Sequence, residues 1–237
     1  MDPLTLFRHG GVHVLNPAEI TSIDETHDLF DVDGVLKVMP LPFWKQFDQQ
    51  SITYFCVKHG LYCLPTTELI DWLRVHIGER TAIEIGAGNG AICKALGIPG
   101  TDSFQQSDPK YAQIYAAQGQ QTVQYGPHVL KHDGNDAVRL LRPNVAVGAW
   151  VTHRFDPSRG EHGGNEVGVD EHALVASVDE YLVICNEAVH HGKLIVHDIA
   201  SGKLPGYQMR ILPAPVASRS LLGAGADFIL SISRSAS

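Results

Sequence analysis

The sequence predicts an α/β protein whose core is a mostly parallel β-sheet with helices on both faces. From residue 65 onward, short apolar runs alternate with amphipathic segments in units of about thirty residues or less, which is the pattern of a doubly wound sheet. Of all residues, 44% are hydrophobic and 19% are charged, a composition typical of a globular protein. The 237 residues suffice for one domain with a sizeable core.

Residues 1–64 differ in character from the rest of the chain. They are rich in turn residues and in aromatic side chains. We expect them to form an arm or cap over a main domain that spans residues 65–237. Within the arm, residues 43–47 predict a helical turn, and residues 50–56 fit either a short strand or the end of a helix.

The main domain opens with a helix whose start is signalled by Pro65-Thr66-Thr67-Glu68 and whose end is Gly78, because apolar residues recur between them at helical spacing. Asp108, before a proline, predicts the start of another helix, on which Tyr111, Ile114 and Tyr115 should face inward. The remaining expected elements are strand 81–85, helix 91–96, strand 100–104, a strand at 122–125 or 129–131, helix 137–141, strand 145–151, a helix after Asp170 and strand 181–185.

The chain ends with two further apolar runs, at residues 209–218 and 228–233. The link between them, around Gly223-Ala-Gly225, is too short for a crossover between parallel strands. We therefore expect a C-terminal hairpin that adds one antiparallel strand to the sheet.

The sharpest local signal is Glu84-Ile-Gly86-Ala87-Gly88-Asn-Gly90, in which an apolar strand runs into a glycine turn and then a helix. Glycine lets the backbone approach a ligand closely, and a helix N-terminus favours polar or anionic groups. Two cofactors compete for this loop. Gly86, Gly88 and Ala91 satisfy a loose dinucleotide fingerprint, although the third glycine, Gly90, comes one position early.

The same segment resembles the first motif of class I S-adenosylmethionine (SAM)-dependent methyltransferases, acidic-x-Gly-x-Gly-x-Gly at the end of the first strand. The resemblance extends over residues 65–233 as an order of elements that includes the terminal hairpin. It implies a Rossmann-like fold and SAM as cofactor, with Glu84 near the methionine end and the loop from Gly86 to Gly90, including Ala87, packed against it. The chain also resembles uncharacterised bacterial and phage proteins of this fold.

The resemblance extends to two further acidic residues. Asp102 falls at the end of the second strand, where the family has a ribose-binding acid, and a carboxylate there accepts hydrogen bonds from both hydroxyls. Asp133 resembles the residue that contacts the adenine amine. Each has an alternative interpretation as a plain turn or cap residue.

The segment after the fourth strand is where ligands bind in such sheets. We expect Trp150 to lie beside the cofactor, and Thr152 and His153 to line the acceptor site as catalytic residues. His153 has the chemistry of a general base, and the alternative interpretation is a loop histidine that hydrogen-bonds the backbone. The loop of residues 158–168 fits either a substrate lid or an ordinary surface loop.

These observations predict a SAM-dependent methyltransferase that acts on a small molecule or a protein side chain. The formal net charge of −8 and the missing (Asp/Asn)-Pro-Pro-aromatic motif after the fourth strand argue against a nucleic-acid acceptor. The alternatives are a non-catalytic binding module and an NAD-dependent oxidoreductase. The thirteen histidines match no metal-site spacing, so we expect no metal. Without a membrane span or a signal peptide, we expect a cytoplasmic protein.

Overall fold

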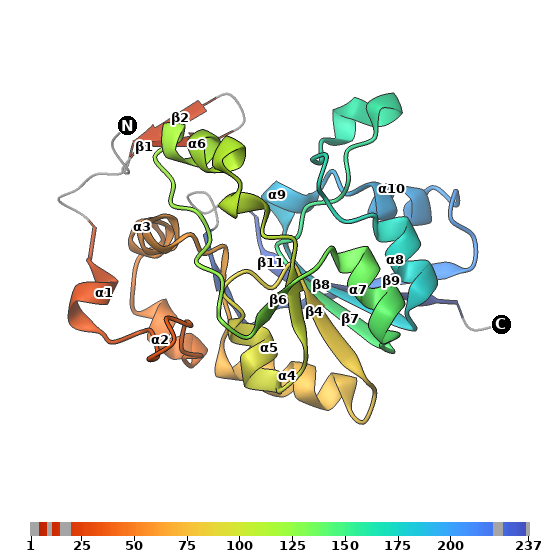
Figure 1. Cartoon of the computed structure of the whole chain (residues 1–237), viewed down its shortest axis with the longest axis horizontal. Helices are drawn as coiled ribbons and strands as arrows, with labels where there is room; N and C mark the ends of the chain where they lie inside the picture. Colours follow the sequence, from red (N-terminus) through yellow and green to blue (C-terminus); the bar gives the residue numbers. More distant parts are fainter. Residues whose placement is uncertain (1–4, 9–10, 15–19, 220–224, 236–237) are drawn as a thin grey trace.

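The computed structural model describes residues 5–8, 11–14, 20–219 and 225–235, and Figure 1 shows their arrangement. A seven-stranded sheet forms the centre of this part of the chain. Two pairs of short antiparallel strands lie outside it: β1 (Thr5–Arg8) with β2 (Gly11–Val14), and β3 (Cys63–Leu64) with β10 (Ala217–Ser218).

The order of strands across the sheet is β6 (Val129–Lys131), β5 (Gly100–Asp102), β4 (Ala82–Ile85), β7 (Val145–Ala149), β8 (Glu180–Asn186), β11 (Asp227–Arg234) and β9 (Tyr207–Pro213). The first five pair in parallel, and β11 runs antiparallel to both of its neighbours. This confirms the predicted Rossmann-like sheet with its C-terminal antiparallel hairpin. The order reverses between β4 and β7, and open α/β sheets bind ligands outside the strand ends at such a point.

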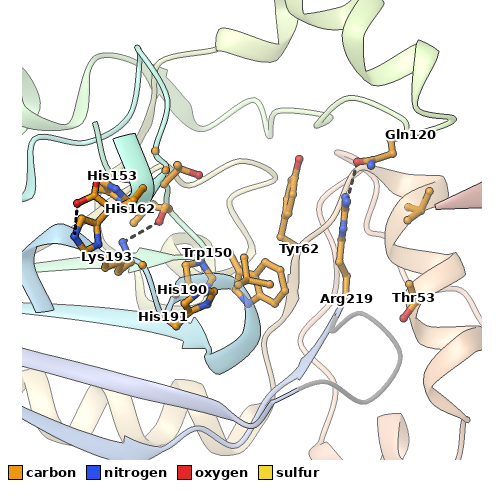
Figure 2. A pocket seen from close by; sticks show the side chains of 18 residues that line it. Thr53, Tyr62, Gln120, Trp150, His153, His162, His190, His191, Lys193 and Arg219 are labelled. Carbon is orange, nitrogen blue, oxygen red and sulfur yellow. Dashed lines mark hydrogen bonds and ion pairs between the residues drawn. The ribbon is translucent and has the colours of Figure 1, made fainter. Parts of the chain in front are cut away.

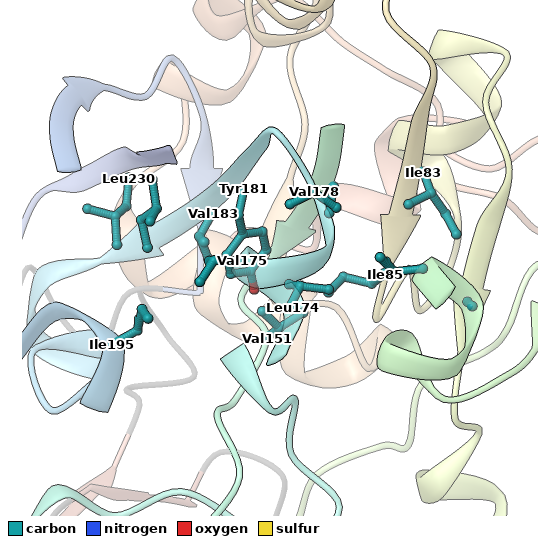
Figure 3. Close-up of a cluster of buried hydrophobic side chains, with 14 of the residues drawn as sticks. Ile83, Ile85, Val151, Leu174, Val175, Val178, Tyr181, Val183, Ile195 and Leu230 are labelled. Atoms are coloured by element: carbon teal, nitrogen blue, oxygen red, sulfur yellow. The ribbon is translucent and has the colours of Figure 1, made fainter. Parts of the chain in front are cut away.

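Helices cover both faces of the sheet. One face packs against α7 (Gly134–Leu141), α8 (Glu171–Ser177) and α10 (Leu194–Ala200), and the other against α4 (Thr67–Ile77) and α5 (Ala91–Leu96). Along β8, Tyr181 and Val183 point to the first face (Figure 3), and Leu182 and Ile184 point to the second. Because both faces are covered, β8 is buried along its whole length, which explains its continuous apolar sequence.

Side-chain caps fix the helix starts that the sequence predicted. The Thr66 hydroxyl accepts a hydrogen bond of 3.1 Å from the Leu69 amide at the start of α4. Asp108 accepts one of 2.8 Å from the Lys110 amide at the start of α6 (Pro109–Ala117). Each cap satisfies an amide that has no partner within its helix.

The N-terminal arm contains α1 (Ile23–Thr26), α2 (Leu41–Lys45) and α3 (Gln49–His59). Its buried side chains, among them Trp44 and Phe55, form a third cluster that also includes Ala91 of α5. The arm also contacts the glycine turn directly, because the Leu36 amide donates a hydrogen bond of 2.6 Å to Asn89 Oδ1. The arm therefore helps to position the turn.

Several local expectations are settled or corrected. Helix α3 covers residues 50–56, and the strand lies at 129–131 and not at 122–125. The inward orientation of Ile114 was wrong, since 47% of its surface is exposed. The reason is that α6 lies beyond the strand ends and not on a face of the sheet, and none of its residues is buried. The linker residue Gly223 lies outside the described residues.

Four short elements without a clear sequence signal complete the described chain. They are the two 3₁₀ helices η2 (Gln105–Ser107) and η3 (Pro157–His162), the one-turn helix α9 (Glu187–His190) and α10. Helix η3 lies within the loop that was interpreted as a lid or surface loop. Among the described residues, no helix has the length and apolar character that crossing a membrane requires.

Candidate active site

Two connected hollows lie where β4, β5, β6 and β7 end. The larger, which we call the central cavity, measures about 190 Å³, and its wall includes Gly86, Gly88, Asp102, Asp133 and Trp150. The smaller, the loop cavity, measures about 70 Å³ and lies against the turn from Glu84 to Gly90. All the residues that the sequence assigned to the cofactor thus line one or both of these hollows.

The turn after β4 requires its glycines. Gly86, Gly88 and Gly90 have φ values of 60°, 53° and 80°, which side chains with a Cβ rarely adopt. A Cβ on Gly86 would lie 2.6 Å from Val151 Cγ1, and one on Gly90 would lie 2.6 Å from His128 Nε2. The backbone therefore forms the floor of both cavities where a side chain would fill them.

The buried side chain of Glu84 connects the end of β4 with α5 and so stabilises the glycine turn between them. Its Oε2 accepts a hydrogen bond of 2.8 Å from the Cys93 amide in the first turn of α5. Burial raises the pKa of this carboxyl to about 7, against the partly compensating effect of the Cys93 hydrogen bond. Glu84 also lines the loop cavity, so its carboxyl would interact with the charge of a ligand bound there.

The raised pKa of Glu84 predicts a pH-dependent stability. A carboxyl whose pKa is about 7 in the folded state, against an ordinary value of 4.5, stabilises the fold while it is protonated and loses that contribution as pH rises through 7. In Glu84→Gln the amide oxygen can still accept from Cys93, but nothing titrates. Between pH 4.5 and pH 8 the wild type should lose about 3 kcal/mol of unfolding free energy relative to the variant. Urea unfolding at several pH values measures this difference, and a pH-independent difference would contradict the assignment.

Asp102 connects the second strand with the glycine turn. Its Oδ2 accepts a hydrogen bond of 3.0 Å from the Gly88 amide, and its Oδ1 accepts one of 2.9 Å from the Phe104 amide. Burial raises its pKa. Each carboxylate oxygen keeps capacity for a second hydrogen bond, so Asp102 can accept from a pair of ligand hydroxyls in the central cavity.

Asp133 combines the two roles that the sequence left open. Its Oδ1 accepts hydrogen bonds from the Asn135 and Asp136 amides, at 2.9 and 3.1 Å, and so caps α7. It also lines the central cavity. Near it, the rings of Phe104 and Tyr125 stack with centroids 4.0 Å apart, and Tyr125 belongs to the cavity wall.

A third hollow, the lateral cavity, adjoins the central cavity and measures about 400 Å³. Its wall combines residues of the arm, of the segment after β7 and of the segment around α9 (Figure 2). Four residues line both cavities and form the boundary between them: Tyr62, Trp150, Val151 and Thr152. Trp150 has a φ of 56°, so its backbone bends sharply where β7 ends at this boundary.

His153 lies on the lateral side of this boundary, 7% exposed. Burial lowers the pKa of its imidazole, with Glu171 opposing and Lys193 reinforcing the shift. Its Nε2 is buried without a hydrogen-bond partner among the described residues. A neutral imidazole with a free ring nitrogen beside a cavity can accept a proton from a bound molecule.

Beneath the lateral cavity lies a buried ion pair. Lys193 Nζ is 2.5 Å from Glu171 Oε1 and 3.0 Å from the Val151 carbonyl oxygen, and both side chains are at most 2% exposed. The Tyr181 hydroxyl donates to the same Glu171 oxygen, at 3.2 Å. The carbonyl bond connects Lys193 to the segment that carries Thr152 and His153.

Tyr62 belongs to the aromatic-rich arm that was expected to cover the main domain, and it lines all three cavities. Sequence reasoning missed several other wall residues. Tyr115 and Tyr125 line the central cavity. Arg219 and Lys193 line the lateral one. A lysine in the otherwise apolar run 193–196 was a usable signal, because an unpaired charge is seldom buried. For the others, isolated tyrosines and an arginine outside any motif carry no such signal.

No cluster of three or more histidine, cysteine, aspartate or glutamate side chains that could hold a metal ion occurs in residues 5–8, 11–14, 20–219 and 225–235. The histidines around the lateral cavity have other contacts. The Asn186 amide donates to His190 Nδ1 at 2.9 Å, and the rings of His162 and His197 pack with centroids 4.3 Å apart.

Comparison with known proteins adds little beyond the fold. No family model and no curated protein matches the chain. Among solved structures, it is similar to magnesium protoporphyrin IX methyltransferase from Synechocystis with bound SAM (16% identity, TM-score 0.41, covering 71% of this chain and 77% of that one). It is also similar to cofactor-bound Rv0187 from MTB (12%, 0.40, 82% and 91%) and to the human methyltransferase 10 domain containing protein (14%, 0.39, 78% and 98%). At these identities and TM-scores, the argument for a function rests on the geometry of the site.

Proposed function

We propose that this protein is a SAM-dependent methyltransferase that acts on a small molecule bound in the lateral cavity. The observation that carries the proposal is the wall shared by two cavities, one lined by the glycine turn and two carboxylates, the other by His153. A volume of about 400 Å³ is that of a small-molecule site, which favours a small acceptor over a protein side chain.

The residues of the central and loop cavities fit SAM. The glycine turn offers a backbone surface, since Gly86 and Gly88 line both cavities and present no side chain to them. Asp102 has acceptor capacity left for ribose hydroxyls, and Asp133 lies farther along the same wall for the adenine. With the methionine end at the turn, the reactive centre would lie near Trp150 and Thr152, where the lateral cavity begins.

When bound, SAM would supply a methyl group on a positively charged sulfur, and its transfer to a lone pair of the acceptor would leave S-adenosylhomocysteine and one proton. Trp150 and Val151 would exclude water from this point. His153 would accept the proton, because its depressed pKa keeps it neutral at physiological pH. Alignment of the acceptor by the lateral cavity would contribute most of the rate.

Thermal unfolding with S-adenosylhomocysteine tests the proposal. At about 100 times its Kd the ligand should raise the unfolding free energy by about 2.7 kcal/mol, and hence the midpoint by about 5–10 °C. NAD⁺ should give no shift. The variant His153→Gln should keep the full shift, because His153 lines neither the central nor the loop cavity. A shift with NAD⁺ alone would favour an oxidoreductase, and no shift with either ligand would favour a non-catalytic module.

A further inference from the structure

The far side of the lateral cavity holds an arginine that the proposed chemistry does not use. Arg219 follows β10, and its amide donates a hydrogen bond of 3.0 Å to the Tyr62 carbonyl oxygen. Its guanidinium lies 4.5 Å from the centre of the Tyr62 ring, and Nη2 donates to Gln120 Oε1 at 2.7 Å (Figure 2). These three contacts hold the planar group in one orientation.

One nitrogen of this group has no partner. Arg219 Nη1 is buried and makes no hydrogen bond with any described residue, although a buried guanidinium donor without a partner is costly. No carboxylate of the described chain lies within ion-pair distance of Arg219. The arginine is therefore a cation held in place at the wall of the lateral cavity, and its Nη1 has no hydrogen-bond partner among the described residues.

The other charged or titratable groups of this wall do not compete for an anion. Lys193 is paired with Glu171. Burial lowers the pKa of His153, and it lowers that of His190 to about 3, so both rings are neutral at physiological pH. Glu161 is 72% exposed and lies 3.5 Å from His162. Among the described lining residues, Arg219 is the only cation without a carboxylate partner.

We propose that Arg219 binds a carboxylate of the methyl acceptor, which is a small aromatic carboxylic acid. That the bound molecule is a methyl acceptor rests on the proposed function, whereas the binding of a carboxylate to Arg219 does not. The aromatic part of the molecule would lie along Tyr62 and Trp150, whose ring centroids are 6.3 Å apart. Arginine matches a carboxylate because its planar donors fit the planar oxygens.

A carboxylate fits this site better than a phosphate. A phosphate group carries up to two charges and several strong acceptor oxygens, and its sites combine several donors. Here Arg219 is the single cation of the described wall without a carboxylate partner, and the neighbouring α9 has only four residues. The single positive charge of Arg219 therefore matches the single negative charge of a carboxylate.

The position of Arg219 also orients the acceptor. Figure 2 shows Arg219 and Tyr62 on one side of the cavity, His153 and Lys193 on the other, and Trp150 between them. With its carboxylate on Arg219 beside Tyr62, the bound molecule would extend along Tyr62 and Trp150 toward the side of the cavity that holds His153. The methylated atom is therefore a hydroxyl or amine distant from the carboxylate, and not the carboxylate itself.

Binding of three probes to the full-length protein tests the inference: 4-hydroxybenzoate, its neutral counterpart 4-hydroxybenzamide, and phenyl phosphate. NMR titration should show 4-hydroxybenzoate binding about tenfold or more tightly than either of the others, because one hydrogen bond to a charged group is worth that factor. Arg219→Gln should remove this preference, and Arg219→Lys should retain part of it. Arg139→Gln, which changes an exposed arginine on α7 (Gly134–Leu141), should leave it intact.

The outcomes separate this inference from the proposed function. Equal binding of 4-hydroxybenzoate and the amide, or a preference for phenyl phosphate, would overturn the carboxylate assignment even if S-adenosylhomocysteine binds. A preference for 4-hydroxybenzoate without S-adenosylhomocysteine binding would keep the carboxylate site and reject the methyltransferase. If Arg219→Gln weakens S-adenosylhomocysteine binding about tenfold, the arginine serves the cofactor's own carboxylate, and the inference is wrong. Wild-type-like unfolding of Arg219→Lys guards against a folding artefact.

Discussion

Gly88→Leu should abolish SAM binding while the protein stays folded. The leucine side chain would project between the loop cavity and the central cavity, both of which Gly88 lines. Its backbone φ of 53° adds a strain of about 1–2 kcal/mol, which a stable domain tolerates. We expect the affinity for S-adenosylhomocysteine, measured by calorimetry, to fall more than about a hundredfold, since steric overlap with the ligand outweighs any single lost contact.

Gly202→Leu is the matched control for this variant. Gly202 has a φ of 72°, and a Cβ there would meet no atom within 4 Å, so the same strain is introduced away from the cavities. Both variants should unfold at similar denaturant concentrations, and only Gly88→Leu should lose the ligand. Unchanged binding in Gly88→Leu would remove the glycine turn from the cofactor site.

Lys193→Met should cause the largest loss of stability. The substitution leaves the Glu171 carboxylate at 1% side-chain exposure without its cation, and Oε2 of that group already has no partner among the described residues. Breaking a buried ion pair in this way costs about 3–5 kcal/mol. Urea unfolding measures the loss, and the transition should shift without a change in its slope.

Two further variants test whether the unpaired Glu171 carboxylate causes the loss of stability in Lys193→Met. Lys37→Met breaks a pair with Asp28 in which the side chains are 39% and 87% exposed, and it should cost less than about 1 kcal/mol. Adding Glu171→Leu to Lys193→Met should recover most of the stability, because an apolar pair of similar volume replaces the two charges. If Lys193→Met is as stable as Lys37→Met, the buried pair contributes nothing.

The parts of the fold that follow from local rules were predictable. Strand β4, the turn and α5 form one contiguous stretch in which glycine positions, apolar runs and the C-terminal Gly97 agree. The hairpin followed from the shortness of its link. The orientation of Ile114 was predicted wrongly. Helical periodicity shows which residues share one face of a helix, but not whether another element packs against that face, and no residue of α6 is buried.

The candidate site was predictable only where it follows strand ends. Asp102 and Asp133 could be placed because Asp102 ends one strand of the predicted series and Asp133 comes two residues after another. On the opposite wall, the aromatic-rich arm with Tyr62 was expected as a cap, but its contact with Arg219 was not predictable, since Tyr62 precedes β3 and Arg219 follows β10 near the other end of the chain. They meet because β3 and β10 pair. Each of these strands has only two residues, so the sequence shows no alternating pattern from which the pairing could be predicted.

The interpretation of Glu84 shows a similar limit. The resemblance placed it near the methionine end of the cofactor, and its position in the loop cavity wall is compatible with that prediction. Its hydrogen bond to the Cys93 amide is a contact that the sequence did not suggest, because it depends on the angle at which α5 leaves the turn. Cofactor contact by Glu84 stays a prediction.

Asn89 makes the shape of the glycine turn a shared property of three distant segments. Its amide nitrogen donates to the carbonyl oxygens of Gly34 and Gln124, each at 3.0 Å, while its oxygen accepts from Leu36. Because the arm and the segment before β6 both hold this turn, its conformation cannot change independently of theirs. Any ligand that tightens this turn must also tighten the arm, and by thermodynamic reciprocity any change that loosens the arm must weaken that ligand.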